Sequence, residues 1–293
     1  MRTRKLGPFE VSAIGLGAMP FSMGDNVRPD EQQAIATVHA ALDAGVSFID
    51  TADIYAPSWD TMGHNEEIVA RALAAYGPTD HVVVGTKGGI TRGPSEAWGR
   101  DGSLAYLRTA VEASLRRLGR DVIDLYQWHR PDPSLEYAEV VGHLKTLQDE
   151  GKVRAVGISN ANLEQIDIAV GVLGVDGLAS VQNEFSPRFL SSRGELEHCG
   201  RLGVAFLPWS PLGGTGRAGE VGSRATVFAE VGRELGVSPQ QVVLAWELSL
   251  GDHVIPIPGA SRRETITDSA RAAALRLDPG HIAKIEAQWG PRS

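Results

Sequence analysis

Four side chains in this sequence could together deliver a proton to a carbonyl oxygen. They are Asp50, Tyr55, Lys87 and His129, and each lies at or just beyond the carboxyl end of a short apolar run. A phenol ionises near pH 10, so a tyrosine that acts as an acid at neutral pH needs a nearby cation to stabilise its phenolate. Lys87 could be that cation, and Asp50 could hold and polarise the lysine.

Each of these residues also has a structural explanation. Lysine is rarely buried without a partner, so Lys87 and Asp50 could form a structural salt bridge. A lone tyrosine in a loop is more often a packing residue, and His129 alone would be a hydrogen-bonded core histidine. An acid, a lysine and a histidine at the ends of three consecutive runs favour proton transfer to a carbonyl. Because no side chain supplies a hydride, reduction would also need a nicotinamide.

Eight short apolar runs alternate with helical patterns and must position these residues. Runs of this length, rich in Val and Ile and bounded by Gly or Pro, are typical of buried parallel strands. They cover 12–17, 45–50, 81–88, 122–129, 153–160, 178–185, 204–210 and 253–259, with helical spacing at 29–45, 65–76, 103–119, 135–150, 162–173, 191–202, 224–250 and 262–276. The pattern predicts an α/β fold: one (β/α)8 TIM barrel domain over 1–293, with its active site at the C-terminal ends of the strands.

Composition excludes several other kinds of protein. The formal net charge is −8 and the basic residues are scattered, so we expect no nucleic-acid partner. One cysteine, Cys199, excludes an intrachain disulfide and a Cys-based metal cluster. The histidines form no H-x-H or H-E-x-x-H pair, which counts against a metal-dependent barrel hydrolase. Without a long apolar run, a cytoplasmic protein with no membrane partner is expected.

Motifs around these residues resemble those of the aldo-keto reductases over essentially the whole chain. They are FIDTADIYAP (48–57), GHNEEIVARAL (63–73), VVVGTKGG (82–89), DLYQWHRPDP (124–133), VGISNA (156–161), VQNEFSP (181–187), PWSPLGG (208–214) and IPIPGASR (255–262). The resemblance implies that Tyr55 is the general acid and that Lys87 lowers its pKa. It also implies that Asp50 anchors Lys87, that His129 orients the carbonyl, and that hydride leaves the 4-pro-R position of a nicotinamide.

The resemblance also assigns residues to the nicotinamide and the pyrophosphate. By this likeness Ser159, Asn160 and Gln182 hydrogen-bond the nicotinamide carboxamide, an amide that all three side chains suit. Trp209 would stack on the nicotinamide ring, although apolar filling of the strand is its structural alternative. The pyrophosphate would contact a Gly-rich loop that presents backbone N–H groups, at Ser210, Leu212 and Gly214.

The adenosine 2′-phosphate would be recognised after the eighth run, by Ser261, Arg262 and Arg263. Arginine suits phosphate, whereas two arginines opening a helix are unfavourable near its dipole unless an anion is bound. The sequence departs from the family pattern at Thr265, where many members have a further arginine. It also departs at 268–269, where Asp-Ser replaces the commoner Glu-Asn that grips adenine. We therefore predict NADPH as the cofactor, with NADH possible.

The loops above the barrel would choose the substrate. Met19, Trp59 and Trp98 could supply apolar walls for an aldehyde, ketone or sugar-like carbonyl, although aromatic loop residues are often local packing. The Gly-rich stretch 213–223 predicts a mobile loop, and Asp53 is interpreted as a turn or capping group. No sequence signal sets the oligomeric state.

The sequence thus predicts an NADPH-dependent carbonyl reductase. The alternative is a non-catalytic nicotinamide-binding regulatory subunit of the same fold, because some relatives regulate a membrane partner. The intact set of Asp50, Tyr55, Lys87 and His129 counts against that alternative.

Overall fold

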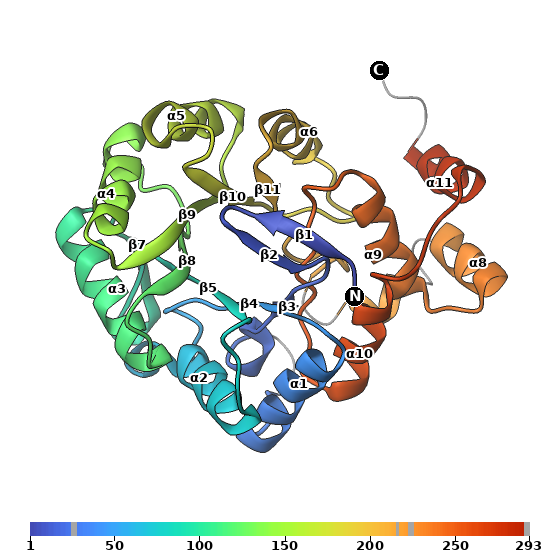
Figure 1. Cartoon of the computed structure of the whole chain (residues 1–293), viewed down its shortest axis with the longest axis horizontal. Helices are drawn as coiled ribbons and strands as arrows, with labels where there is room; N and C mark the ends of the chain where they lie inside the picture. Colours follow the sequence, from blue (N-terminus) through green and yellow to red (C-terminus); the bar gives the residue numbers. More distant parts are fainter. Residues whose placement is uncertain (25–27, 215–216, 222–225, 290–293) are drawn as a thin grey trace.

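A curved parallel sheet surrounded by helices forms the body of the protein (Figure 1). This computed structural model describes residues 1–24, 28–214, 217–221 and 226–289. Seven strands pair in the order β3, β4, β5, β8, β9, β10 and β11, and every pairing between them is parallel. Their bounds are Leu16–Gly17, Phe48–Asp50, Val83–Gly88, Ile123–Trp128, Val153–Ser159, Leu178–Gln182 and Ala205–Phe206.

The predicted eighth strand, 253–259, is not a regular strand, yet it closes the barrel. Pro256 and Pro258 have no N–H to donate, so this segment cannot form a continuous ladder. Their carbonyls accept backbone hydrogen bonds from the β3 side at 2.9 and 3.0 Å. On the other side, the N–H of Ile255 donates to the carbonyl of Phe206 at 2.9 Å. The predicted (β/α)8 barrel is therefore confirmed, with an irregular eighth member.

Helices pack around the outside of the sheet and bury the apolar faces that the sequence pattern predicts (Figure 1). They are α1 Glu31–Asp43, α2 His64–Tyr76, α3 Leu104–Leu118, α4 Tyr137–Asp149, α5 Leu163–Leu173, α6 Arg193–Leu202, α8 Thr226–Leu235, α9 Pro239–Ser249, α10 Arg263–Arg271 and α11 Pro279–Glu286. The single helical stretch predicted over 224–250 is wrong. Gly236, at φ 68°, ends one helix, and Ser238 caps the next by accepting from the N–H of Gln241.

Short 3-10 helices lie in the loops and at the chain's end. They are η1 Met19–Phe21, η2 Trp59–Thr61, η3 Pro94–Glu96, η4 Ala218–Glu220 and η5 Ala287–Trp289. No helix in the described ranges is both long and apolar enough to cross a membrane.

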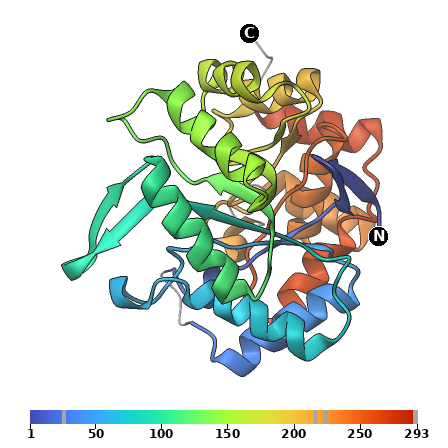
Figure 2. The same cartoon turned by 60° about the vertical axis from the view of Figure 1, so that its left-hand side comes forward.

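Two hairpins were not expected from the sequence. The first, β1 Thr3–Leu6 with β2 Phe9–Ser12, covers the amino-terminal end of the barrel (Figure 1). Its Leu6 and Val11 join the apolar cluster that fills the barrel interior. The second, β6 Ile90–Gly93 with β7 Ala97–Arg100, projects away from the barrel (Figure 2). In both hairpins the alternation of apolar and polar residues is too short to stand out from the stronger pattern of the barrel strands.

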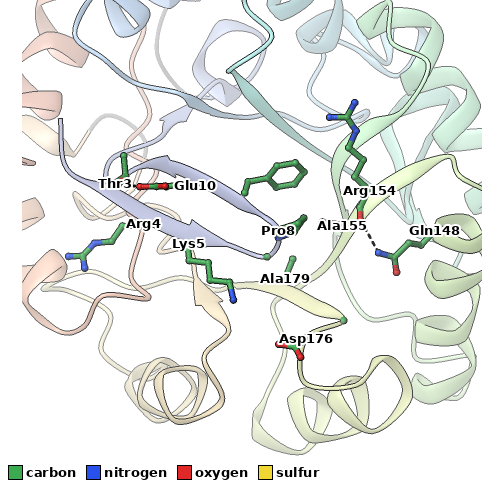
Figure 3. A pocket seen from close by; sticks show the side chains of 13 residues that line it. Thr3, Arg4, Lys5, Pro8, Glu10, Gln148, Arg154, Ala155, Asp176 and Ala179 are labelled. Carbon is green, nitrogen blue, oxygen red and sulfur yellow. Dashed lines mark hydrogen bonds between the residues drawn. The ribbon is translucent and has the colours of Figure 1, made fainter.

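A cavity of about 710 Å³ lies beside the first hairpin, at the end of the barrel where the strands begin (Figure 3). Its lining includes Lys5 and Glu10 of the hairpin and Arg154 at the start of β9. None of the predicted catalytic, cofactor or substrate residues lines it. In this fold the chemistry is at the opposite end, so we assign no function to this cavity.

Glu247 of α9 is buried without a partner and should lower stability. Neither of its carboxyl oxygens has a hydrogen bond within the described residues, and burial raises its pKa well above the ordinary range. In the unfolded state a Glu carboxyl ionises near pH 4.3, whereas in the folded protein it stays protonated to higher pH. The free energy of unfolding should therefore fall as the pH rises above that value, because only the unfolded state then loses the proton. We expect Glu247→Leu to raise the Tm by about 3 °C at pH 8, and by less at pH 5.

Thermal unfolding followed by circular dichroism at both pH values checks this expectation. Glu164→Leu is the matched control because Glu164 lies exposed in the first turn of α5, and its Tm should change by less than about 1 °C. A lower Tm for Glu247→Leu at pH 8 would show that the carboxyl has a stabilising partner.

Candidate functional site

One cavity of about 610 Å³ opens at the carboxyl ends of the strands, where the sequence places the chemistry. It brings together most of the predicted residues. Those that line it are Asp50, Tyr55, His129, Ser159, Asn160, Gln182, Trp209, Ser210, Leu212, Gly214, Ser261, Arg262, Met19 and Trp98. Lys87 lies behind the wall with no exposed surface, whereas Arg263 and Trp59 do not line the cavity.

Lys87 is the centre of the predicted proton-transfer group. Its Nζ donates to Asp50 Oδ2 at 2.7 Å and to the carbonyl of Thr51 at 2.8 Å, and it lies 3.5 Å from the Tyr55 hydroxyl. β4 and β5 are adjacent parallel strands, so their carboxyl ends deliver Asp50 and Lys87 to the same edge. Burial lowers the pKa of Lys87, but the interactions with Asp50 and Tyr55 raise it by more, so the pKa ends above the ordinary value. The ammonium therefore stays charged.

The pKa of Tyr55 differs from the sequence expectation. Burial raises it, Lys87 opposes the rise, and Asp50 adds to it, so the pKa ends above the ordinary value for a phenol. Lys87 therefore lowers the cost of forming phenolate without bringing the pKa below normal. A phenol that stays protonated at neutral pH is the form a proton donor requires.

His129, at the end of β8, faces Tyr55 across the cavity wall. The two rings meet edge to face, with centroids 5.7 Å apart and planes at 81°. Burial, then the charges of Lys87 and Arg130, lower the pKa of His129 well below its ordinary value. The imidazole is therefore neutral at neutral pH, and one of its nitrogens can donate a hydrogen bond to an oxygen.

The predicted nicotinamide residues form a hydrogen-bonded network with the catalytic group. Gln182 Nε2 donates to Asp50 Oδ1 at 2.8 Å, and Asn160 Nδ2 donates to the His129 carbonyl at 3.1 Å. The Ser159 hydroxyl donates to the Gln182 carbonyl at 2.8 Å. These bonds use the amide N–H₂ groups and leave two side-chain oxygens, Asn160 Oδ1 and Gln182 Oε1, without a donor among the described residues. Such acceptors fit the NH₂ of a carboxamide.

Two non-glycine residues of the predicted cofactor site have left-handed backbone. Asn160 has φ 58° and Ser210 has φ 54°, and both follow strand ends at the cavity. This conformation costs free energy in L-residues and is concentrated at functional sites. Beyond Ser210, the backbone of Gly213 and Gly214 is also at positive φ, where glycine carries no such cost. The predicted mobile loop 213–223 includes 215–216 and 222–223, which lie outside the described residues.

The predicted 2′-phosphate site lies at the far end of the same cavity. Arg262 is the N-cap residue of α10 and lines the cavity together with Ser261 and Thr265. Asp268 is used elsewhere, because it accepts hydrogen bonds from Ser238 and Gln241 of the α9 region at 2.6 and 2.5 Å. This residue therefore joins two helices, and it lies outside the cavity lining.

The substrate side of the cavity differs from the sequence expectation. Met19 and Trp98 line it as predicted, but Trp59 opens the 3-10 helix η2, is 39% exposed and lies outside the lining. The structure adds apolar and cationic residues that sequence reasoning missed: Met23, Ile54, Ile90, Arg100 and Arg130. Only Arg130 had a signal in the sequence, because it directly follows His129.

Asp53 lies in a turn, as the sequence suggests, but its side chain is buried. It is 2% exposed, and its Oδ1 has no hydrogen-bond partner in the described residues. Burial and the nearby carboxylate of Glu66 raise its pKa well above the ordinary value, which favours the neutral carboxyl.

A neutral, buried Asp53 should tolerate the isosteric amide. We expect Asp53→Asn to keep kcat/KM for carbonyl reduction within about threefold, whereas Asp50→Asn, which removes the carboxylate from Lys87, should lower it about 100-fold. Steady-state kinetics of both variants measures the difference. Similar losses from the two substitutions would show that the wrong aspartate is assigned.

Known proteins match this chain along nearly its whole length. A sequence model of the Aldo/keto reductase family matches residues 13–289. An oxidoreductase of Schizosaccharomyces pombe is 33% identical over 288 residues, which cover 97% of this chain and 89% of that protein.

Solved structures agree with this similarity. An aldo/keto reductase from Klebsiella pneumoniae, in complex with NADP and acetate, has a TM-score of 0.81 and 27% identity, covering 99% of this chain and 96% of its own. A glycerol dehydrogenase from Gluconobacter oxydans has a TM-score of 0.83 and 28% identity, and the match covers 99% of this chain and 97% of the dehydrogenase. This chain belongs to the aldo/keto reductase family and is an NAD(P)H-dependent oxidoreductase.

Proposed function

We propose that this protein reduces an aldehyde or ketone to the alcohol with NADPH, and that Tyr55 donates the proton. The observation that carries the proposal is the position of Lys87 Nζ, 2.7 Å from Asp50 Oδ2 and 3.5 Å from the Tyr55 hydroxyl, at a cavity that the predicted cofactor residues also line. The Klebsiella relative bound to NADP supports the choice of cofactor.

Each residue has a distinct task in this reaction. When bound, NADPH supplies the hydride. Tyr55 holds a proton at its hydroxyl oxygen and gives it to the carbonyl oxygen, while the Lys87 ammonium stabilises the phenolate that remains. Asp50 keeps Lys87 in place and charged. His129, neutral at neutral pH, orients the carbonyl oxygen toward Tyr55 by a hydrogen bond.

The cofactor would lie along the cavity from the catalytic group to α10. Asn160 and Gln182 would offer oxygens to the carboxamide, Trp209 would stack on the ring, and the backbone from Ser210 to Gly214 would hold the pyrophosphate. Arg262 lines the cavity beside the end of the chain's last barrel segment and would meet the 2′-phosphate. Arg263 lies outside the lining, so we assign the selection of NADPH over NADH to Arg262.

Consumption of NADPH and NADH by the purified protein, followed by absorbance over a panel of aldehydes, ketones and sugars, tests the proposal. We expect turnover of at least one carbonyl, with NADPH preferred. Tight NADPH binding without turnover of any carbonyl would favour the regulatory subunit instead. Neither binding nor turnover would contradict both functions.

A further inference from the structure

Arginines gather in the lining of the cavity at the carboxyl ends of the strands, and two of them lie away from the predicted phosphate contacts. Among the residues that the structure describes, three arginines line this cavity: Arg100, Arg130 and Arg262. The one acidic residue of the lining within those same ranges is Asp50, which is already paired with Lys87. This excess of cations contrasts with the chain's formal net charge of −8. Clefts lined by one sign of charge attract ligands of the opposite sign.

Arg130 lies next to the group that would handle the carbonyl. It directly follows His129, and its charge is one of the causes that lower the pKa of that histidine. Its side chain makes no hydrogen bond or ion pair with another described residue. Its charge opposes the rise in the pKa of Glu184 that burial causes, but Glu184 lies outside the cavity lining. The five donors of this guanidinium are thus available to a ligand.

Arg100 reaches the same part of the cavity from the second hairpin. Its Nη1 donates to the carbonyl of Pro131 at 2.8 Å, which places it beside the segment that carries Arg130. One carbonyl occupies one nitrogen only. No acidic side chain within the described ranges forms an ion pair with Arg100, although its charge is one of the causes that lower the pKa of Asp132. The remaining donors of a guanidinium suit a bidentate contact with a carboxylate or a phosphate.

The β6–β7 hairpin is fixed in place, so Arg100 is not a freely swinging surface residue. Arg92 of β6 donates to the carbonyl of Ala56, one residue after Tyr55, at 2.7 Å. Directly after β7, the N–H of Gly102 donates to Asp132 at 3.0 Å. The hairpin is therefore tied near its turn to the segment that follows Tyr55, and just after its second strand to the segment that follows Arg130.

These two arginines lie apart from the predicted phosphate contacts. The phosphate-binding residues follow the last barrel segments, at 210–214 and 261–262. Arg100 and Arg130 instead lie beside the ends of β7 and β8, together with the apolar Ile90 and Trp98. Their charge is thus placed on the substrate side of the cavity.

We propose that Arg100 and Arg130 select a carbonyl substrate that carries an anionic group, a carboxylate or a phosphate ester, at the end remote from the reacting carbon. This inference rests on the proposed carbonyl reduction. In it, His129 and Tyr55 hold the carbonyl oxygen while the two guanidinium groups bind the anion. The apolar residues between them contact the body of the substrate.

The test compares kcat/KM for anionic and neutral aldehydes of the same shape. The probes are para- and meta-carboxybenzaldehyde, the corresponding formylphenyl phosphates, and the methyl esters of the two acids, all with NADPH. We expect kcat/KM for one class of anionic aldehyde to exceed kcat/KM for its neutral counterpart by about tenfold or more at low salt. Added NaCl should reduce the preference because the arginines are exposed. The class with the larger preference identifies the anion.

Substitutions of Arg100 and Arg130 then test whether these residues cause the preference for the anionic aldehydes. Arg100→Gln and Arg130→Gln should each lower the anion-to-ester ratio by about tenfold, and the double variant should bring it near one. Lysine at either position should restore part of the ratio. Arg154→Gln, at the other end of the barrel, is the control and should leave the ratio unchanged. The Kd for NADPH, measured by fluorescence, should not change in any of these variants.

Two results would overturn the inference and leave carbonyl reduction standing. One is turnover of acids, phosphates and esters with ratios near one. The other is a loss of NADPH affinity in the arginine variants with no change in the ratio, which would assign both residues to the cofactor. No turnover of any probe or of any carbonyl in the wider panel would instead remove the proposed function, and this inference with it.

Discussion

Replacing Tyr55 with phenylalanine is expected to lower kcat/KM for carbonyl reduction by about 1,000-fold. The substitution removes only the hydroxyl, which lies 3.5 Å from Lys87 Nζ, and keeps the ring against His129. Without that hydroxyl, no group so placed can give a proton to the carbonyl oxygen as negative charge develops on it. Because the cofactor residues are untouched, the Kd for NADPH should stay within about twofold of the unchanged protein.

Tyr137→Phe is the matched control for this experiment. Like the Tyr55 hydroxyl, the Tyr137 hydroxyl is buried, but it has no hydrogen-bond partner in the described residues. Tyr137 lies outside the cavity lining, and its ring packs on Trp128. Its removal should leave kcat/KM unchanged. A loss of less than about tenfold in Tyr55→Phe would assign the proton to another donor.

Replacing Lys87 with methionine is expected to have an effect of similar size, by a different route. The Lys87 ammonium is fully buried and paired with Asp50, so its loss leaves an uncompensated carboxylate and removes the cation that stabilises phenolate. We expect kcat/KM to fall by about 1,000-fold. The free energy of unfolding should also fall, by about 3–5 kcal/mol, because breaking a buried pair is strongly destabilising.

A double variant separates these two effects. In Lys87→Met with Asp50→Asn, the unpaired carboxylate is gone, so much of the lost stability should return. Activity should remain as low as in Lys87→Met, because the ammonium beside Tyr55 is still absent. Urea unfolding and steady-state kinetics provide the two measurements. Recovery of activity along with stability would mean that Lys87 serves the fold alone.

The sequence was sufficient to predict that Asp50, Lys87 and His129 lie together, because parallel strands align their ends. The three residues lie at the carboxyl ends of three strands that are neighbours in the sheet. A buried lysine requires an acid, so its pairing with Asp50 followed from chemistry as well as from position. Similarity to the family then assigned Tyr55, whose loop has no periodic pattern of its own.

Loops and packing between helices were beyond such reasoning. Trp59 was expected in the cavity, yet it lies in a 3-10 helix that a capping box at Ser58 and Thr61 fixes, outside the lining. The sequence predicts that Asp53 lies in a loop. Its burial depends on side chains of α2 and α3 that meet around it, including Arg117. Arg100 lines the cavity because it lies at the base of the β6–β7 hairpin, paired with Ile90, and the sequence pattern did not predict this hairpin.

The central claim is that one cavity joins a nicotinamide hydride donor to the proton donor Tyr55. NADPH deuterated at the 4-pro-R position tests it most directly, with the product alcohol analysed by mass spectrometry after a single turnover. We expect deuterium on the former carbonyl carbon with the unchanged protein, and no detectable product in the same time with Tyr55→Phe, although that variant binds the cofactor. An alcohol without deuterium would show that the hydride has another source, and equal product formation by the two proteins would show that Tyr55 is not the proton donor.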